Sequence, residues 1–157
     1  MTFAPARQDD HKFMDDSLAA ANGSYNNGGI PVGAILVRSG AILASGCNRS
    51  MQTGDPTSHG ETDCLRNAGL LDTFDGTTLY TTLSPCEMCA GAVIFLRIQR
   101  LVVGERQNYV GNLEYLVAKG VEVTLLNHLG CIELLERYIS ECPNIWNRIT
   151  RADAGRR

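Results

Sequence analysis

Two short motifs bring together a histidine, two cysteines and a glutamate at spacings that suit a zinc site. The first motif is His59-Gly60-Glu61, and the second is Pro85-Cys86-Glu87-Met88-Cys89. Zinc binds imidazole nitrogen and thiolate sulfur, and a catalytic zinc keeps one position open beside three protein ligands. Water bound in that position becomes acidic, with a pKa of about 7. We therefore expect His59, Cys86 and Cys89 to hold one Zn²⁺ that activates water for hydrolysis.

The spacing within each motif assigns different roles to the sulfurs and to the carboxylate. Cys86 and Cys89 are three residues apart at the start of an expected helix, so both sulfurs lie on one face. Helix N-termini favour negative charge, and thiolate is the form that binds zinc. Glu61 follows His59 by two residues and would lie beside the bound water. A carboxylate there can take the water proton and pass it to a ring nitrogen, which makes Glu61 the expected catalytic residue.

Three other interpretations share parts of this pattern. A CxxC pair also occurs in redox proteins and in closed structural zinc sites. A closed site would need a fourth protein ligand, for which His128 and Cys64 are the candidates. A non-catalytic, zinc-stabilised binding domain would likewise hold the metal with four protein ligands and no water. A redox dithiol would leave Pro85 and the HxE motif unexplained, and the combination of both motifs favours the open catalytic site.

Length and composition indicate one globular domain over residues 1–157. Hydrophobic residues make up 44% of the chain and charged residues 20%, which is typical of a soluble folded protein. The net charge is −3, and no basic stripe of the kind that phosphate backbones require is present, so we expect no nucleic-acid partner. The C-terminal arginines are expected to be solvated rather than to form a binding surface: Arg148, Arg151, Arg156 and Arg157.

The sequence gives no signal for secretion or for a membrane. Its N-terminus lacks the apolar segment of a signal peptide, and no run approaches the roughly 18–20 apolar residues that span a bilayer. Six cysteines in such a chain indicate a reducing, cytoplasmic setting, in which paired cysteines point to metal. The four cysteines outside the CxxC motif are expected to be small buried hydrophobes: Cys47, Cys64, Cys131 and Cys142.

Helix and strand patterns alternate along the chain. Helices are expected over 9–26, from Ser58, from Pro85 to 96, over 112–118 and 132–140, and as a short segment from Pro143. Strands are expected over 30–37, 41–45, 77–81, 100–103 and 121–125. Ser58 and Ser84 have the spacing of helix N-caps to Glu61 and Glu87. The first two strands should be antiparallel, and strands separated by helices should form a largely parallel sheet covered on both faces.

Taken together, these motifs resemble the cytidine/deoxycytidylate deaminase superfamily, and most of all its fungal-type cytosine deaminases. The HxE and PCxxC motifs match the signature of zinc deaminases. The likeness runs from about residue 13 to Trp146, and its other specific pieces are Gly29-Ile30-Pro31-Val32-Gly33, Gly46-Cys47-Asn48, Thr81-Thr82-Leu83-Ser84 and Val103-Gly104-Glu105. The resemblance implies a three-layer α/β/α sandwich around a five-stranded mixed sheet. It also implies a homodimer with one zinc per subunit.

The same resemblance implies which residues hold the substrate. Asn48 and the backbone of Gly60 would contact the carbonyl and nitrogen edge of the ring, and the Ser84 carbonyl would accept the departing amino group. The pocket walls would be Val32, Tyr109 and Trp146. Three of these residues have a plainer interpretation: Asn48 can satisfy a turn, Trp146 can fill the core, and Tyr109 can lie in a surface loop.

One position departs from the cytosine deaminases. In those enzymes an acidic residue follows the C-terminal tryptophan by three positions and binds the amino side of the substrate, whereas here that position is Ile149. Arg148 and Glu105 are the two candidates to take its place.

We therefore expect a hydrolytic deaminase that releases ammonia from a small free amino-azaheterocycle. Candidate substrates are cytosine, 5-substituted or aza-cytosines, isocytosine and aminotriazines. A tRNA adenosine deaminase is an alternative, because Asp55-Pro56-Thr57-Ser58-His59 resembles a segment of that family, although Gly60 stands where those enzymes usually carry alanine. Guanine deaminase is a further alternative.

Overall fold

The computed structural model describes the backbone of residues 2–154 and the side chains of residues 2–150. Its centre is a five-stranded sheet with the strand order β2-β1-β3-β4-β5. The strands are β1 (Gly33–Arg38), β2 (Ala41–Cys47), β3 (Thr77–Leu83), β4 (Arg100–Glu105) and β5 (Glu122–Leu125). β1 pairs antiparallel with β2, as expected, and also with β3, whereas β3, β4 and β5 pair in parallel. The sheet is therefore mixed, and less parallel than the sequence pattern alone indicates.

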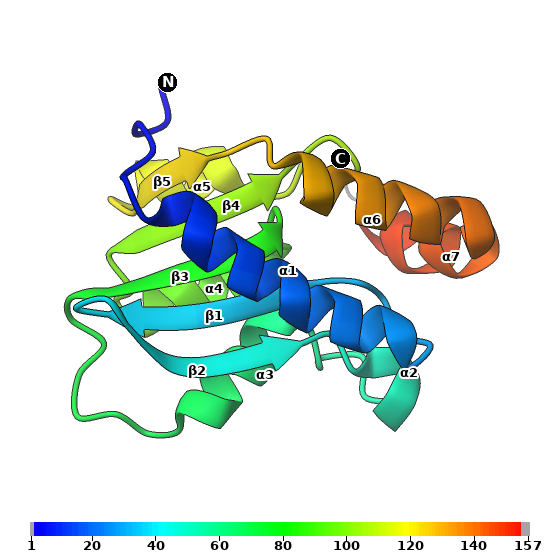
Figure 1. The fold of residues 1–157 in the computed structure, drawn as a ribbon, viewed down its shortest axis with the longest axis horizontal. Helices are drawn as coiled ribbons and strands as arrows, with labels where there is room; N and C mark the ends of the chain where they lie inside the picture. The colour runs from blue at the N-terminus through cyan, green and yellow to red at the C-terminus, as the bar shows by residue number, and fades with distance from the viewer. Residues whose placement is uncertain (1, 155–157) are drawn as a thin grey trace.

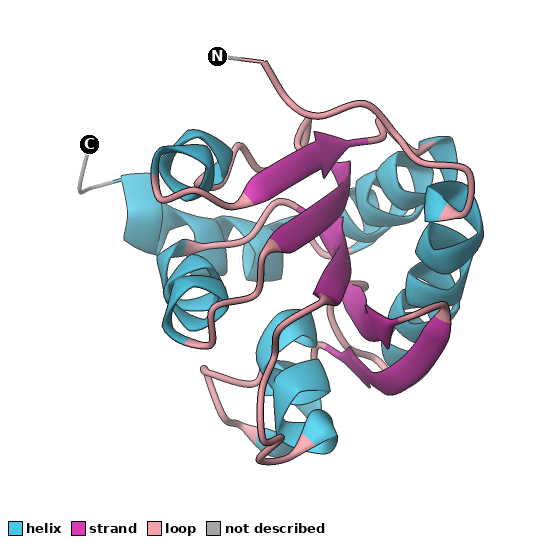
Figure 2. Cartoon of the chain, turned by 90° about the vertical axis from the view of Figure 1, so that its left-hand side faces the viewer, coloured by secondary structure: helices cyan, strands magenta, loops and turns pink. Residues whose placement is uncertain are grey.

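Helices cover both faces of this sheet (Figures 1 and 2). One face packs against α1 (Asp10–Asn26) and α6 (Leu129–Glu141), and the other against α3 (Gly60–Ala68), α4 (Glu87–Phe95) and α5 (Leu113–Ala118). A short helix that the sequence did not indicate, α2 (Ser50–Thr53), follows β2, and α7 (Pro143–Ala154) packs against α6. The expected three-layer α/β/α architecture is confirmed. None of the helices in the described part of the chain is long and apolar enough to cross a membrane.

The central strands are apolar on both sides because both faces of the sheet are covered. Along β1, Ala34 and Leu36 belong to the core beneath α3, α4 and α5, while Ile35 and Val37 belong to the core beneath α1. Side chains alternate between the two faces of a strand, so one continuous apolar run fills both cores.

Helix α3 starts one residue later than its sequence predicts. Ser58 was the expected N-cap, but the N-cap is His59 and the first helical residue is Gly60. The Thr62 hydroxyl accepts a hydrogen bond from the His59 N–H at 2.9 Å, which closes the first turn one residue further along. This start places the His59 side chain at the helix end rather than within the first turn.

Helix α4 also starts later than expected, at Glu87 with Cys86 as N-cap, instead of at Pro85 with Ser84 as N-cap. The Ser84 hydroxyl is used elsewhere, because it donates a hydrogen bond to the Val110 carbonyl at 2.9 Å. That bond joins the segment before α4 to a distant loop, which a local capping pattern does not reveal.

A buried ion pair joins the N-terminus of α1 to the sheet. The Arg100 guanidinium, on β4, donates two hydrogen bonds to the two oxygens of Asp10 at 2.8 and 2.7 Å. Asp10 also accepts hydrogen bonds from the Tyr80 hydroxyl at 2.9 Å and from the Arg7 N–H at 2.7 Å. Burial raises the pKa of Asp10, but the bonds from Arg100, Arg7 and Tyr80 outweigh it and lower the pKa below its ordinary 3.8.

Replacement of Asp10 by asparagine is expected to lower the free energy of unfolding by roughly 3–5 kcal/mol, because it leaves the Arg100 charge buried without its partner. The pKa of Asp10 is lower in the folded protein than in the unfolded chain. The ionised carboxylate therefore contributes its full stabilisation at pH values above the unfolded-state pKa, and this stabilisation is lost as the pH falls through the folded-state pKa. Urea unfolding measured at a series of acidic pH values should therefore show that the free energy of unfolding depends less on pH in Asp10→Asn than in the wild-type protein. Asp9→Asn, at the exposed neighbouring position, is the control, and an equal loss there would contradict this account.

Candidate metal centre and its pocket

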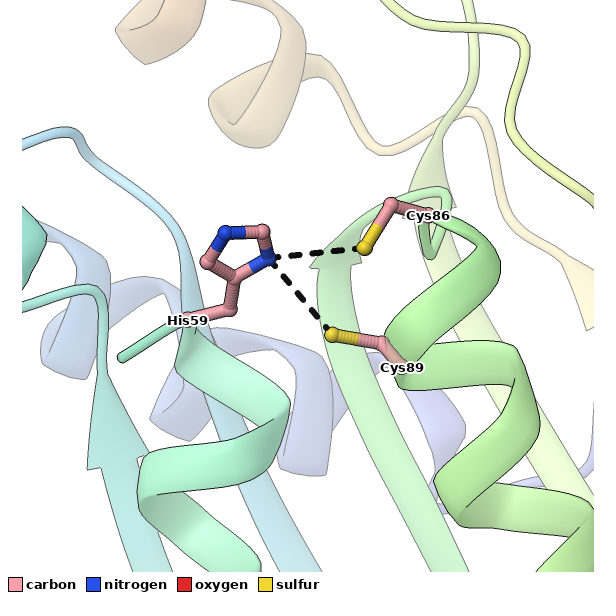
Figure 3. Close-up of side chains that lie close together, drawn as sticks. All are labelled: His59, Cys86 and Cys89. Carbon is pink, nitrogen blue, oxygen red and sulfur yellow. Dashed lines mark hydrogen bonds between the residues drawn. The ribbon is translucent and has the colours of Figure 1, made fainter. Parts of the chain in front are cut away.

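Three potential zinc ligands meet where two helices begin. His59 is the N-cap of α3, Cys86 is the N-cap of α4, and Cys89 lies in the first turn of α4. Their ligand atoms all lie within 4.8 Å of one another, and Figure 3 shows the two sulfurs and the imidazole pointing toward a common point. Because α4 directly follows β3, the meeting point is at the carboxyl end of the parallel strands.

The spacing of these atoms fits a tetrahedral zinc. The Nδ1 atom of His59 lies 3.5 Å from the Cys86 sulfur and 3.6 Å from the Cys89 sulfur. Zinc bonds of about 2.3 Å to sulfur and about 2.0 Å to nitrogen separate tetrahedral ligands by about 3.5 Å. His59 also hydrogen-bonds to the backbone of Pro56, a contact of the kind that fixes the ring orientation of a metal-binding histidine. The three side chains are thus already arranged for the metal.

The electrostatics of the cluster favour a thiolate. A hydrogen bond from the Cys89 thiol, with a further bond from His59, lowers the pKa of Cys86 to about 4 against the opposing effect of burial. The interaction with Cys86, together with burial, raises the pKa of Cys89. The hydrogen bond to Cys86 raises the pKa of His59. Cys86 is therefore the sulfur of the pair that ionises more readily, and thiolate is the form that binds zinc.

Glu61 lies beside this cluster and is only 3% exposed. One of its oxygens accepts a hydrogen bond from the Thr81 hydroxyl at 3.1 Å, and the other accepts one from the Cys89 thiol at 3.4 Å. Burial, and then the negative charge of Cys86, raises the pKa of Glu61. A carboxyl group with a raised pKa at the edge of a metal cluster is suited to accept and return a proton.

A cavity of about 380 Å³ opens over the cluster. Of the residues expected at the site, those that line it are Val32, Asn48, His59, Glu61, Ser84, Cys86, Tyr109 and Trp146. Cys89 is buried and is not among the lining residues, but its thiol donates a hydrogen bond to the lining residue Glu61. Gly60 is buried between two lining residues, and a Cβ there would lie 3.0 Å from the Val32 carbonyl oxygen. The structure thus gathers these widely separated positions around one cavity.

Arg148 and Ile149, which the sequence singled out beside the missing acidic residue, also line the cavity, whereas sequence reasoning missed five further lining residues: Ile30, Ser50, Pro56, Leu83 and Thr150. Thr150 follows Trp146 by four positions on α7, and helical spacing from the tryptophan would have found it. Of the two candidates to replace the missing acidic residue, Arg148 lines the cavity, whereas Glu105 is not among the lining residues.

The alternative of a closed, four-ligand site finds no support in the described residues. Neither suggested fourth ligand belongs to the cluster of ligand atoms. The Cys64 thiol donates a hydrogen bond to the Ala44 carbonyl at 3.6 Å, and His128 contacts Asp15 at 3.1 Å. The three-ligand group beside a cavity is the arrangement that leaves a metal position open to solvent.

Comparison with known proteins gives a consistent picture. Residues 7–105 match the family model described as the cytidine and deoxycytidylate deaminase zinc-binding region. The chain is 42% identical over 142 residues to a cytosine deaminase of Candida albicans, covering 88% of this chain and 95% of that protein. It is 39% identical over 139 residues to a tRNA-specific adenosine deaminase of Buchnera aphidicola, covering 87% and 85%. A solved structure of guanine deaminase from Nitrosomonas europaea superposes with a TM-score of 0.74 at 26% identity, covering 88% and 87%.

Purified protein is expected to contain about one zinc ion per chain. Replacing Cys86 by serine removes a thiolate ligand and should leave metal content far below that level, measured by inductively coupled plasma mass spectrometry. Cys142→Ser, at a half-buried cysteine outside the cluster, is the matched control and should retain the metal. Equal zinc in both variants would contradict the assignment of Cys86 as a ligand.

Proposed function

Because the chain belongs to the cytidine and deoxycytidylate deaminase family and is a zinc-dependent deaminase, we propose that its substrate is a small free amino-azaheterocycle. The reaction, carried out within this single domain, replaces the ring amino group with a carbonyl oxygen and releases ammonia. The observation that carries the proposal is the buried Glu61 beside a three-ligand cluster at the base of a cavity lined by Trp146 and Tyr109. We favour cytosine and its 5-substituted or aza analogues, isocytosine and aminotriazines.

The small volume of the cavity and its lining by α7 support a free ring as the substrate rather than a polynucleotide. Its volume of about 380 Å³ is at the small end of the roughly 300–1,000 Å³ of ligand pockets. Residues of α7 line it, including Trp146, Arg148 and Ile149, so this helix occupies space that a longer substrate would need. The net charge of −3 also provides little attraction for a phosphate backbone.

In the proposed reaction, Glu61 transfers the protons. Zinc held by His59, Cys86 and Cys89 would supply an acidified water for hydrolysis. Glu61 contacts Cys89 and lines the cavity, so its carboxylate is within reach of both the metal position and a bound ring. It takes the water proton, delivers it to the ring nitrogen, and carries the second proton to the departing amine. The Thr81 hydroxyl holds one oxygen of Glu61 during these transfers.

Asn48 and the segment around Ser84 orient the ring. The side-chain oxygen of Asn48 accepts hydrogen bonds from the Ser50 N–H at 3.1 Å and from the Ser50 hydroxyl at 2.7 Å. The amide NH₂ group of Asn48 is thereby left as a donor to the ring carbonyl. The backbone N–H groups of Gly60 and Cys86, at helix starts, stabilise developing negative charge. The Ser84 carbonyl receives the amino group, and the ring is enclosed by Val32, Tyr109 and Trp146.

The remaining parts of the proposal concern assembly and setting. We propose a homodimer formed through α4, where Phe95 is 83% exposed and Met88 is also exposed, since large apolar side chains on one helix favour burial against a second copy. All six cysteines are free, which supports a reducing, cytoplasmic setting.

Two alternatives follow from the relatives. The tRNA-specific adenosine deaminase of Buchnera aphidicola covers nearly as much of the chain as the cytosine deaminase does, and the Nitrosomonas europaea relative is a guanine deaminase. Adenosine in a tRNA and free guanine are therefore the second and third candidate substrates.

Ammonia release should separate these substrates. Cytosine, 5-fluorocytosine, isocytosine, an aminotriazine, guanine and a tRNA anticodon stem-loop containing adenosine would be compared at equal concentration. We expect turnover of at least one free pyrimidine or triazine and none of the stem-loop. Conversion of the stem-loop adenosine to inosine with all free rings inert, accompanied by binding that weakens steeply with salt, would overturn the proposal.

Replacement of Glu61 by glutamine is expected to lower kcat by about 10²- to 10⁴-fold while the zinc content stays at that of the wild-type protein, because it removes proton transfer and not a ligand. Glu87→Gln makes the same chemical change at an exposed position next to Cys86 and should leave kcat unchanged. Near-normal turnover of zinc-loaded Glu61→Gln would refute the proposed proton transfer.

A further inference from the structure

The loop that brings Tyr109 to the cavity leaves the sheet directly after Glu105. Glu105 is the last residue of β4 and its side chain is fully buried. In the described part of the chain, no lysine, arginine or histidine forms an ion pair with it. A buried carboxylate without a cation is costly unless hydrogen bonds replace the lost water, so the groups that bond to Glu105 indicate its purpose.

The Glu105 carboxylate accepts hydrogen bonds from the loop that follows it. One oxygen accepts the backbone N–H of Gln107 at 2.5 Å and that of Asn108 at 3.0 Å. The other oxygen accepts the side-chain NH₂ of Asn108 at 3.2 Å. Burial raises the pKa of Glu105, opposed by these hydrogen bonds from Asn108 and Gln107. The carboxylate thus turns the chain back on itself immediately before Tyr109.

The far end of the loop is held against the metal-binding segment. The Ser84 hydroxyl donates to the Val110 carbonyl at 2.9 Å, and the Asn112 N–H donates to the Pro85 carbonyl at 3.2 Å. Gly111, with φ of +65°, permits this approach, because a Cβ there would lie 2.1 Å from the Ser84 hydroxyl oxygen. Tyr109 therefore lies between two attachment points, one at Glu105 and one beside Cys86.

We propose that Glu105 is a positioning residue, whose buried carboxylate fixes residues 106–110 so that Tyr109 forms one wall of the substrate pocket. The kinetic part of this inference rests on the proposed deaminase function, whereas the ordering of the loop does not. Glu105 itself is outside the pocket lining and acts on the ring only through Tyr109.

Amide hydrogen exchange tests the ordering without any substrate. In Glu105→Gln the neutral side chain keeps its shape but loses charge-assisted hydrogen bonds, which are about twice as strong as neutral ones. We expect exchange in a peptide covering residues 106–112 to become about tenfold faster, while peptides from β3 and α4 are unchanged. Glu114→Gln is the control, because Glu114 is exposed and pairs with Arg106 of the same loop.

Kinetics on the best ring from the ammonia-release panel tests the link to Tyr109. Glu105→Gln is expected to raise KM about five- to tenfold, with a much smaller change in kcat and full zinc content. In a Tyr109→Ala background the same substitution should change KM little, because the group through which it acts is already gone. A residue that merely stabilised the fold would give equal effects in both backgrounds.

The outcomes separate this inference from the proposed function. Unchanged exchange over 106–112 in Glu105→Gln, or additive effects of Glu105→Gln and Tyr109→Ala on KM, would overturn it. If Glu105→Gln fails to fold, the same exchange measurement on Asn108→Ala tests the inference. That substitution, at a partly exposed position, removes one of the groups that donate a hydrogen bond to the Glu105 carboxylate. Faster exchange in a protein that releases ammonia from none of the rings would support the ordering role and reject only the proposed function.

Discussion

The site depends on one constraint: three ligand atoms from the starts of two separate helices must lie close enough together to bind a single metal ion. His59 lies at the start of α3, and the two cysteines lie at the start of α4. The relative position of these helices therefore sets the distances of 3.5 and 3.6 Å between the sulfurs and the imidazole nitrogen. Gly46 contributes to that placement on β2. A Cβ there would lie 2.1 Å from the Cys64 nitrogen, so only glycine lets α3 pack this closely on the edge strand.

The buried surroundings of the cluster then shift the pKa values of its acidic groups. Glu61 and Cys86 are acidic groups in one water-poor site, where like charges interact strongly and protonation states diverge. The pKa of Cys86 falls because hydrogen bonds from Cys89 and His59 stabilise its charge, whereas the pKa of Glu61 rises because burial and the Cys86 charge oppose ionisation. Two neighbouring acidic groups thereby receive opposite pKa shifts, which suits Cys86 to bind metal as a thiolate and Glu61 to the proton transfer that we propose for it.

The sequence predicted the parts that depend on local spacing. The ligand set and the alternation of helices and strands follow from neighbours along the chain, and the structure has both. The starts of α3 and α4 could not be predicted, because Thr62 closes one turn and the Ser84 hydroxyl bonds to distant Val110. The antiparallel β1–β3 pair and the α7 side of the cavity likewise arise from packing between remote segments, which no local pattern encodes.

Contacts between remote segments also decide which residue can replace the acidic group that the pockets of cytosine deaminases carry. Both Glu105 oxygens are occupied by its own loop, and the residue is not among those lining the cavity, so its carboxylate cannot take the place of the acid that Ile149 replaces. Arg148 does line the cavity, and a guanidinium can donate hydrogen bonds but cannot accept them. We therefore propose that the side of the pocket near α7 receives a ring edge that carries acceptors, whereas an acidic residue at that position would bind an amino group.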